Sequence, residues 1–300
     1  MPTGDRRPAE EGQGTSHPGP VEDEGLITCR NLIQWQMRSF KHSKAYFTLK
    51  GLSKKYFTDQ QLRLPRHIAS RLFMDGNLDA LARFFGTDKN ESHYYTQHYQ
   101  YHFHPFRKRS FNLLEIGIGG YENPWDGGHS LRMWKSYFPR ATIYGLDIQD
   151  KSPHNEHRIK TYKGSQLDET LLQQIVKDSG GFDIIIDDGS HFNEHVIKTF
   201  QALFPLLNTN GIYAIEDLQT SYWDVDLNEV SWGGSKDLDA PFTSVNFLKR
   251  LVDGLNYEEF SIENYQPSYF DQTITALHFY HNLAFIYKGD NREGSNRIAP

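Results

Sequence analysis

Residues 182–191, FDIIIDDGSH, limit the possible folds more than any other stretch of the chain. The unbroken β-branched run at 184–186 is typical of a strand buried on both faces of a parallel sheet. Two aspartates and His191 follow directly, at the end of the strand where open α/β sheets bind ligands. We therefore predict a binding site here. The alternative is that Asp188 or Ser190 only caps the next helix.

From residue 111 onward the sequence alternates between predicted strands and predicted helices. Strands are expected at 111–116, 141–146, 158–163, 184–186, 212–215, 276–280 and 283–287, and helices at 130–138, 167–177, 196–207 and 242–255. Strands separated by helices predict a parallel sheet, whereas the last two flank His281-Asn282 and predict a hairpin. Ser130 is a plausible N-cap, residues 208–211 are a predicted turn, and the polar loop 218–240 is typical of a lid or binding segment.

A length of 300 residues suits one large α/β domain with an appendage. Residues 1–25, rich in glycine and proline, are predicted to be a disordered tail. Residues 26–105 are predicted to be a basic, aromatic-rich helical extension, and residues 106–300 the main domain. Between residues 26 and 71, ten Lys or Arg side chains accompany one acid, which favours a solvated face over a packed apolar one. A subunit contact or a site for an acidic surface is the alternative.

The segment before the first strand is rich in histidine and aromatic residues, HYYTQHYQYHFHPF. Zinc needs three or more well-placed ligands, so His98 and His102 are not predicted to bind metal. Tyr95, Tyr99 and Phe103 are instead expected to pack this helix against the main domain.

Composition excludes several classes of protein. The net charge of -6 offers no basic field for nucleic acid. Cys29 is the only cysteine, so an intrachain disulfide and a cysteine-based zinc site are both excluded. No apolar run approaches the roughly 20 residues of a membrane span, and the N-terminus has no apolar signal core. We expect a cytoplasmic protein without membrane or nucleic-acid partners.

The first predicted strand ends in a glycine-rich turn, EIGIGG at residues 115–120. Glu122 occupies the sixth position of the dinucleotide fingerprint G-x-G-x-x-G, and a long loop follows, which argues against a diphosphate on a helix N-terminus. Glu115 would repel a diphosphate but suits the cationic S-adenosylmethionine. Asp147, at the end of the second strand, suits a ribose with free hydroxyls. The alternative is a purely structural strand–helix turn.

Three further carboxylates follow the fourth and fifth predicted strands. Asp188 leaves one strand, and Glu216 and Asp217 leave the other. If these strands are neighbours, the acids converge, and their repulsion requires a cation such as Mg²⁺ or Mn²⁺. His191 then lies within reach of a metal-bound hydroxyl and has a pKa range suited to a general base. The alternative is a set of helix caps with His191 in a structural role.

Five segments together resemble the metal-dependent macrolide-sugar O-methyltransferases: LLEIGIGGY, HSLRMWKSYFP, YGLDI, DIIIDDGSH and YAIEDLQTSYW. The resemblance covers about residues 86–240. It implies an α/β, Rossmann-like class I S-adenosylmethionine-dependent methyltransferase sheet with an antiparallel last strand and, here, an N-terminal helical extension. The family's enzymes carry a larger auxiliary domain, so the N-terminal part departs from their pattern.

The resemblance also implies residue roles. S-adenosylmethionine would be held by Thr87, Glu115, Gly117, Gly119, Ser130, Asp147, Ser165, Gln166 and Asp187. Mg²⁺ would be bound by Asp188, Glu216 and Asp217, and His191 would take the proton from the sugar hydroxyl. The segment GTDK at residues 86–89, followed by His93, resembles a family segment near the cofactor.

The predicted function is methylation of a sugar, or of a similar diol, in a small-molecule natural product. The basic aromatic segment makes a homo-oligomer plausible. A nicotinamide-dependent oxidoreductase is a first alternative, disfavoured by Glu115 and the missing third glycine. A non-catalytic partner protein that binds through residues 26–71 is a second, but it leaves the carboxylates unexplained.

Overall fold

A computed structural model describes residues 59–91, 93–225 and 229–295 of the chain. The chain divides into two compact units, Met1–Arg63 and Leu64–Pro300, and the second contains the sheet. Residues 64–105 thus fall within the same unit as the sheet, although the sequence predicted that the main domain begins at residue 106. The division into an extension at 26–105 and a main domain at 106–300 stays a prediction. The predicted tail, and the basic segment up to residue 58, lie outside the described residues.

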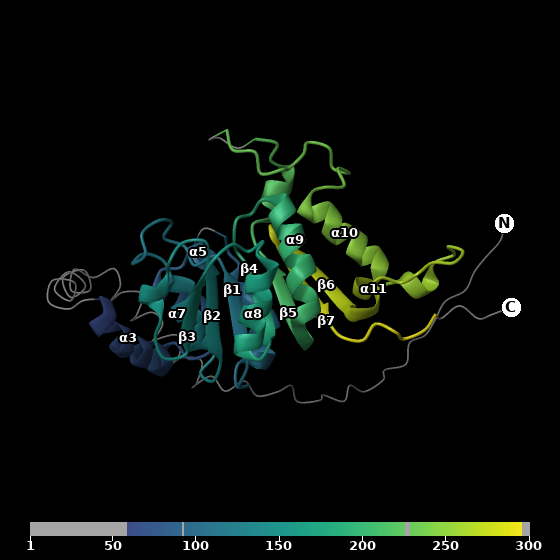
Figure 1. Ribbon diagram of the computed structural model, residues 1–300. Coiled ribbons are helices and arrows are strands. Elements are labelled where there is room, and N and C mark those ends of the chain that lie inside the picture. The colour runs from purple at the N-terminus through teal and green to yellow at the C-terminus, as the bar shows by residue number, and fades with distance from the viewer. Residues whose placement is uncertain (1–58, 92, 226–228, 296–300) are drawn as a thin grey trace, which may run out of the picture. The chain divides into compact units, whose positions relative to one another are not determined.

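The described residues form one sheet of seven strands (Figure 1). The strands are β1 (Asn112–Ile116), β2 (Thr142–Asp147), β3 (Ile159–Lys163), β4 (Phe182–Asp187), β5 (Leu207–Ile215), β6 (Ile274–Tyr280) and β7 (Leu283–Lys288). Their order is β3-β2-β1-β4-β5-β7-β6. Strands β1 to β5 pair in parallel, whereas β7 is antiparallel to both β5 and β6. The predicted class I methyltransferase sheet is therefore confirmed.

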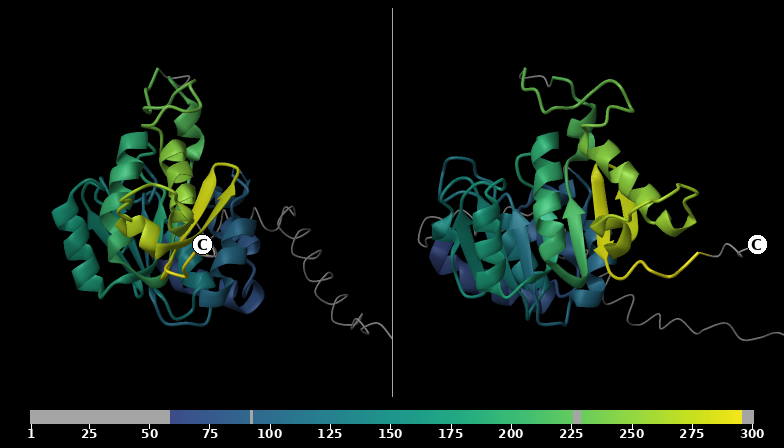
Figure 2. Two further views of the ribbon diagram at one scale, coloured as in Figure 1. Left: turned by 90° about the vertical axis from the view of Figure 1, so that its right-hand side faces the viewer. Right: turned by 45° about the vertical axis from the view of Figure 1, so that its right-hand side comes forward.

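Helices cover both faces of this sheet. The α-helices of the described residues are α3 (Asp59–Phe73), α4 (Leu78–Phe85), α5 (Asp88–Glu91), α6 (Thr96–Phe103), α7 (His129–Tyr137), α8 (Glu169–Ser179), α9 (Asn193–Leu203), α10 (Ser244–Gly254) and α11 (Tyr269–Thr273). Figures 1 and 2 show α8, α9 and α10 along one face. On the other face, Tyr99 of α6 contacts the rings of Trp134 in α7 and Phe285 in β7. The expected packing of this aromatic helix is confirmed.

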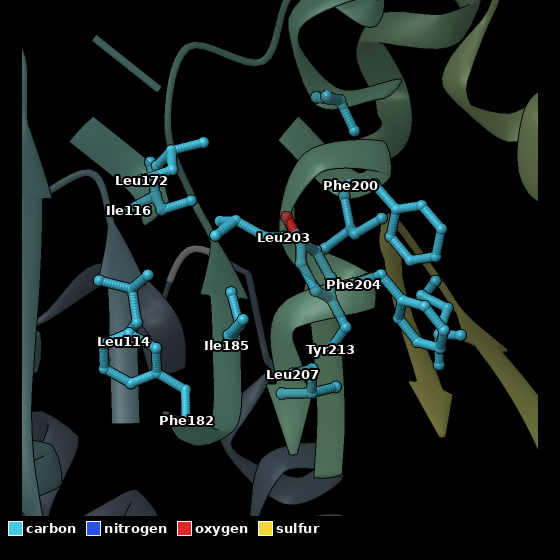
Figure 3. Close-up of a cluster of buried hydrophobic side chains, with 14 of the residues drawn as sticks. Leu114, Ile116, Leu172, Phe182, Ile185, Phe200, Leu203, Phe204, Leu207 and Tyr213 are labelled. Carbon is cyan, nitrogen blue, oxygen red and sulfur yellow. The ribbon is translucent and has the colours of Figure 1, made fainter. Parts of the chain in front are cut away.

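The main apolar core lies between the sheet and helices α8, α9 and α10. Side chains from alternate strand positions, such as Ile185 and Tyr213, interleave with Leu172 of α8 and Phe200 of α9 (Figure 3). Ile184 and Ile186 are also completely buried but lie outside this cluster, as alternation along a strand requires. The isoleucine run is thus buried on both faces, and this burial places the polar residues after it at the sheet edge.

Two local predictions were wrong. The turn expected at residues 208–211 lies inside β5, where the pairing register with β4 shifts and Asn210 adopts a φ of 62°. A strand irregularity and a turn both contain polar residues and glycine, so the sequence pattern does not distinguish them, which explains the error. Ser130 is also not an N-cap, because α7 begins at His129 after Gly128, and the Ser130 hydroxyl donates to Glu115 instead.

Gly117 fixes how closely β1 and β4 approach one another at their carboxyl ends. Its φ is 88°, and a Cβ there would lie 1.9 Å from the carbonyl oxygen of Asp188. Neither the backbone conformation nor the space admits a side chain. The glycine therefore holds the β1 turn against the segment that carries Asp188.

We expect Gly117→Ala to reduce the free energy of unfolding by at least about 3 kcal/mol, because it adds a backbone clash to the strain of a left-handed conformation. Gly180→Ala is the matched control: Gly180 has a φ of 82° with nothing within 4 Å of the added Cβ. The control should lose only about 1 kcal/mol. Urea denaturation measures both, and equal losses would contradict this role of the Asp188 contact.

Candidate active site

Three acidic side chains meet at the carboxyl ends of the neighbouring strands β1, β4 and β5. Glu115 is in β1, Asp188 directly follows β4, and Glu216 directly follows β5. Oxygen atoms of the three carboxylates lie within 4.8 Å of one another. Because β4 pairs with both β1 and β5, sheet topology alone brings these residues together.

A buried lysine occupies the space between these acids. Lys89, in the short helix α5, is 1% exposed. Its Nζ lies 2.6 Å from Glu216, 2.7 Å from Asp188 and 3.3 Å from Glu115. Burial by itself lowers the pKa of this ammonium, but the surrounding carboxylates outweigh burial and hold the pKa well above its ordinary value. Lys89 is therefore a charged counter-ion inside the acidic cluster.

A second group shares Asp188 but is more accessible. The Nε2 atom of His191 lies 3.9 Å from Asp188 Oδ1 and 3.8 Å from Asp217 Oδ2. His191 and Asp217 both have left-handed backbone conformations, with φ of 57° and 55°. Such strain in residues other than glycine is concentrated at functional sites. It turns both side chains toward Asp188.

Helix α6 and its N-terminal flank supply hydrogen bonds to the acids. The hydroxyl of Tyr99 donates to Glu216 at 2.6 Å, and that of Tyr95 donates to Asp217 at 2.8 Å. His93 Nδ1 lies 3.4 Å from Asp217 Oδ1. Burial and the negative charge of Asp188 raise the pKa of Glu216. The tyrosines therefore orient carboxylates that repel one another.

The structure divides the predicted metal ligands. Among the described residues, the groups able to hold an ion are Asp188 with His191 and Asp217, and Glu115 with Asp188 and Glu216. Glu216 and Asp217 are thus in different groups, linked by Asp188. The donor atoms are nearly all carboxylate oxygens, which are the ligands that a hard divalent cation prefers. The donor set fits Mg²⁺, and the assignment of particular ligands stays a prediction.

The residues predicted to hold S-adenosylmethionine surround the same strand ends. Glu115 Oε2 accepts a hydrogen bond from Ser130, while the buried Glu115 Oε1 lies 3.3 Å from Lys89 Nζ. Thr87 is also buried, and its hydroxyl lies 3.3 Å from Asp88 Oδ1. An acidic side chain beside the glycine-rich turn after β1 fits a cationic cofactor.

Asp147 binds the glycine-rich turn. Its carboxylate accepts from the backbone N–H groups of Ile118 and Gln149, at 2.9 and 2.8 Å. Gly119, one residue further, is exposed and has a φ of 75°, and a Cβ there would meet only the Cα of Gly127, at 4.0 Å. Asp147 therefore holds the turn in shape, and the exposure of Gly119 leaves its backbone accessible.

Gln166 and Asp187 lie deeper. The Gln166 amide donates to Thr199 at 2.9 Å and accepts from the Ser190 N–H at 2.8 Å. Burial raises the pKa of Asp187 to about 7. Ser165, half-buried, accepts from the N–H of Leu167. Gln166 thus supports the DDGSH turn from below, and the predicted contacts with a cofactor stay predictions.

The helix-cap alternative for the DDGSH turn is wrong. Helix α9 begins after Phe192, and no side chain caps it. Ser190 Oγ instead lies 2.8 Å from Nδ1 of His195. Asp188 and His191 therefore remain available to the site.

Sequence reasoning missed Lys89, Tyr95 and Tyr99 as parts of the site. The resemblance placed residues 86–89 near the cofactor but assigned no role to the lysine. Tyr95, directly before α6, and Tyr99, within it, are four residues apart, so they lie on the same side of the helix, yet this spacing fits simple packing equally well. A useful signal was charge balance, because converging buried acids require a cation and Lys89 lies in a motif of the same family.

Comparisons with known proteins agree with this geometry. No protein-family model matches the chain. It is 47% identical over 215 residues to mycinamicin VI 2''-O-methyltransferase of Micromonospora griseorubida, covering 71% of the chain and 52% of the relative. It is 48% identical over 215 residues to 8-demethyl-8-alpha-L-rhamnosyl tetracenomycin-C 2'-O-methyltransferase of Streptomyces olivaceus, covering 71% and 55%. The chain is a homologue of these O-methyltransferases.

A solved structure shares the fold. The MycE methyltransferase in complex with Mg, SAH and mycinamycin VI has a TM-score of 0.68 and 45% identity, covering 73% of this chain and 55% of that one. The chain spans about half the length of the curated relatives it matches. The predicted family resemblance is confirmed over this part.

Helix α6, which carries Tyr99, is held on the β6–β7 hairpin by a buried histidine. Nδ1 of His102 lies 2.6 Å from the hydroxyl of Tyr287, and Nε2 lies 2.9 Å from that of Tyr280. The neighbouring His98 stacks on Tyr280. Burial, helped by His278 and His98, lowers the pKa of His102 to about 4. In the described structure these histidines are thus packing residues.

We expect this histidine to weaken the fold as the pH falls. Its pKa is about 4 when folded and about 6.5 when unfolded, so protons bind the unfolded chain first. Stability should drop between pH 6.5 and 4, by up to about 2 kcal/mol after allowance for solvent screening. His102→Gln should flatten the dependence of the free energy of unfolding on pH, measured by urea denaturation. Parallel curves for the two proteins would contradict it.

Proposed function

We propose that the protein is an S-adenosylmethionine- and Mg²⁺-dependent O-methyltransferase that acts on a hydroxyl of a sugar, or a similar diol, in an antibiotic-type natural product. The observation that carries the proposal is the cluster of acids beside His191 at the ends of β1, β4 and β5. Homology to O-methyltransferases supports the reaction class. The acceptor class is inferred from the sugar positions named in those relatives.

The residues of the site fit both S-adenosylmethionine and Mg²⁺. Glu115, the turn at Gly117 and Gly119, and Asp147 would bind S-adenosylmethionine, with Thr87, Ser130, Ser165, Gln166 and Asp187 around them. Asp188, Glu216 and Asp217 would bind Mg²⁺. When bound, the methyl donor supplies an electrophilic carbon on sulfur and the metal supplies a positive charge that favours an alkoxide.

His191 would hold the proton that the acceptor hydroxyl loses. Its Nε2 is the ring atom that faces Asp188 and Asp217, at 3.9 and 3.8 Å, which orients the imidazole toward the acids. Tyr95 would keep Asp217 turned toward the imidazole through its 2.8 Å hydrogen bond. The products are then the methyl ether, S-adenosylhomocysteine and protonated His191, which returns its proton to water.

The segment after Asp217 would contribute to the acceptor site. It begins with the 3₁₀ helix η4 (Leu218–Tyr222) and then rises above the start of α9 (Figure 1). The Asn193 side chain donates to the carbonyls of Thr220 and Trp232, at 3.1 and 3.0 Å. Tyr222 and Trp223 are 49% and 42% exposed, which leaves ring surface to contact a glycoside. The predicted lid or binding role of this loop is part of the proposal.

The wider setting is also proposed. A cytoplasmic location rests on the single cysteine, and a homo-oligomer rests on the basic aromatic segment, most of which lies outside the described residues. Small-molecule glycosides are the proposed partners, without nucleic acid, in keeping with the acidic net charge. Across the described residues no helix is both long and apolar enough to cross a membrane.

The proposal predicts metal-dependent methyl transfer. Purified protein should convert S-adenosylmethionine to S-adenosylhomocysteine with a rhamnosylated polyketide acceptor, EDTA should abolish turnover, and excess Mg²⁺ should restore it. Mass spectrometry of the acceptor should show one added methyl group. Full activity after chelation would contradict the proposed role of Mg²⁺. Binding of NADH but not of S-adenosylhomocysteine would contradict the proposed methyltransferase activity.

His191→Ala should lower kcat by roughly 10²- to 10⁴-fold, since it removes the general base, while binding of S-adenosylhomocysteine stays within about threefold. His195→Ala is the matched control, because His195 is four residues away and contacts Ser190 rather than the acids. Steady-state kinetics and calorimetric titration measure the two effects. An unchanged kcat in His191→Ala would assign the proton to another group.

A further inference from the structure

Lys89 is placed where a bound cation is expected. It is almost completely buried, and its Nζ lies within 2.7 Å of both Asp188 and Glu216. These carboxylates are also proposed ligands of Mg²⁺. One set of oxygen atoms therefore serves an ammonium of the chain and, under the proposed function, a divalent ion.

Charge explains why the site needs a resident cation. Glu115, Asp188 and Glu216 would otherwise place three negative charges within a few ångströms in a poorly solvated space. An unpaired buried charge is strongly destabilising, whereas a paired one is tolerated. Lys89 is one cation among three carboxyl groups, so carboxylate oxygens remain for a further cation.

We propose that Lys89 is the built-in counter-ion of the active site, which keeps the carboxylates of Asp188 and Glu216 together without metal and competes with Mg²⁺ for them. Lys89 is thus a positioning residue that sets metal affinity. This inference rests on the proposed function only in the identity of the ion. It means that the Lys89 ammonium and the divalent ion can partly replace one another beside the carboxylates of Asp188 and Glu216.

A second buried lysine provides the control. Lys151 is also 1% exposed, but its Nζ donates to the backbone carbonyls of Tyr121, Asn123 and Asp126, at 2.9, 2.8 and 3.2 Å. Lys151→Met removes a buried ammonium whose partners are neutral carbonyl groups. Lys89→Met removes a buried ammonium whose partners are carboxylates, so the two variants differ in the charge that is left unpaired.

The experiment measures Tm for wild type, Lys89→Met and Lys151→Met, each with EDTA and across a Mg²⁺ titration, with Mg²⁺ alone as the probe. In EDTA, Lys89→Met should melt about 10 °C below wild type, as expected for unpaired buried charges. Mg²⁺ should restore most of this loss, and its Kd should be at least tenfold lower than in wild type. Lys151→Met should lose stability but keep the wild-type Kd.

Each other outcome is decisive. A Kd for Mg²⁺ in Lys89→Met that is equal to or higher than the wild-type value would overturn competition. If Lys89→Met folds only when Mg²⁺ is present and unfolds on chelation, the metal replaces the ammonium and the proposal holds. If it stays unfolded with or without Mg²⁺ while Lys151→Met folds, the metal does not replace the ammonium and the proposal fails.

The wild-type titrations separate this proposal from the proposed function. If the wild-type protein binds neither Mg²⁺ nor S-adenosylhomocysteine, the proposed methyltransferase function is contradicted. Wild type that binds both, while Lys89→Met shows an unchanged Mg²⁺ Kd, contradicts only the role of Lys89. Lys89→Arg, which retains the charge, should restore both the Tm in EDTA and the wild-type Kd.

Discussion

Repulsion between acids at the ends of β1, β4 and β5 is the constraint on which the site depends. A parallel sheet with its strand ends aligned brings Glu115, Asp188 and Glu216 into one small volume, and burial increases the cost of each charge. Other segments of the same chain offset this cost: the Lys89 ammonium and the Tyr99 hydroxyl contact Glu216, and the Tyr95 hydroxyl donates to the adjacent Asp217. Without these partners the same topology would be unstable at its functional edge.

The segment before β1 is therefore part of the site as well as part of the packing. Tyr99 contacts Trp134 and Phe285 through its ring and Glu216 through its hydroxyl. An aromatic side chain with an apolar body and a polar tip can serve both purposes at once. The buried His102, between the hydroxyls of Tyr280 and Tyr287, fixes the same helix to the antiparallel hairpin. The geometry of the acids thus depends on the far edge of the sheet.

Backbone strain is concentrated where the chemistry is proposed. His191 and Asp217 both hold left-handed conformations, although neither is a glycine, and both flank Asp188. The surrounding hydrogen bonds stabilise this arrangement: Gln166 supports the turn before His191, and Tyr95 holds Asp217. Gly117 meets the same need by lacking a side chain, since a Cβ would strike the carbonyl of Asp188. These unusual backbone conformations fix the positions of the side chains at the strand ends.

By itself, the sequence determined the class of sheet, because strands such as 184–186 are recognisable from a local apolar run that ends abruptly in polar residues. It also predicted that Asp188, Glu216 and Asp217 converge near His191 if their strands are neighbours, since parallel strands end at a common edge. Tertiary structure alone decided which acid faces which partner. The pairing of Lys89 with Glu216, 127 residues apart, and the separation of Glu216 from the adjacent Asp217 both depend on side-chain direction and long-range packing. No local pattern encodes these, because the free energy that selects them arises only when distant segments share one buried space.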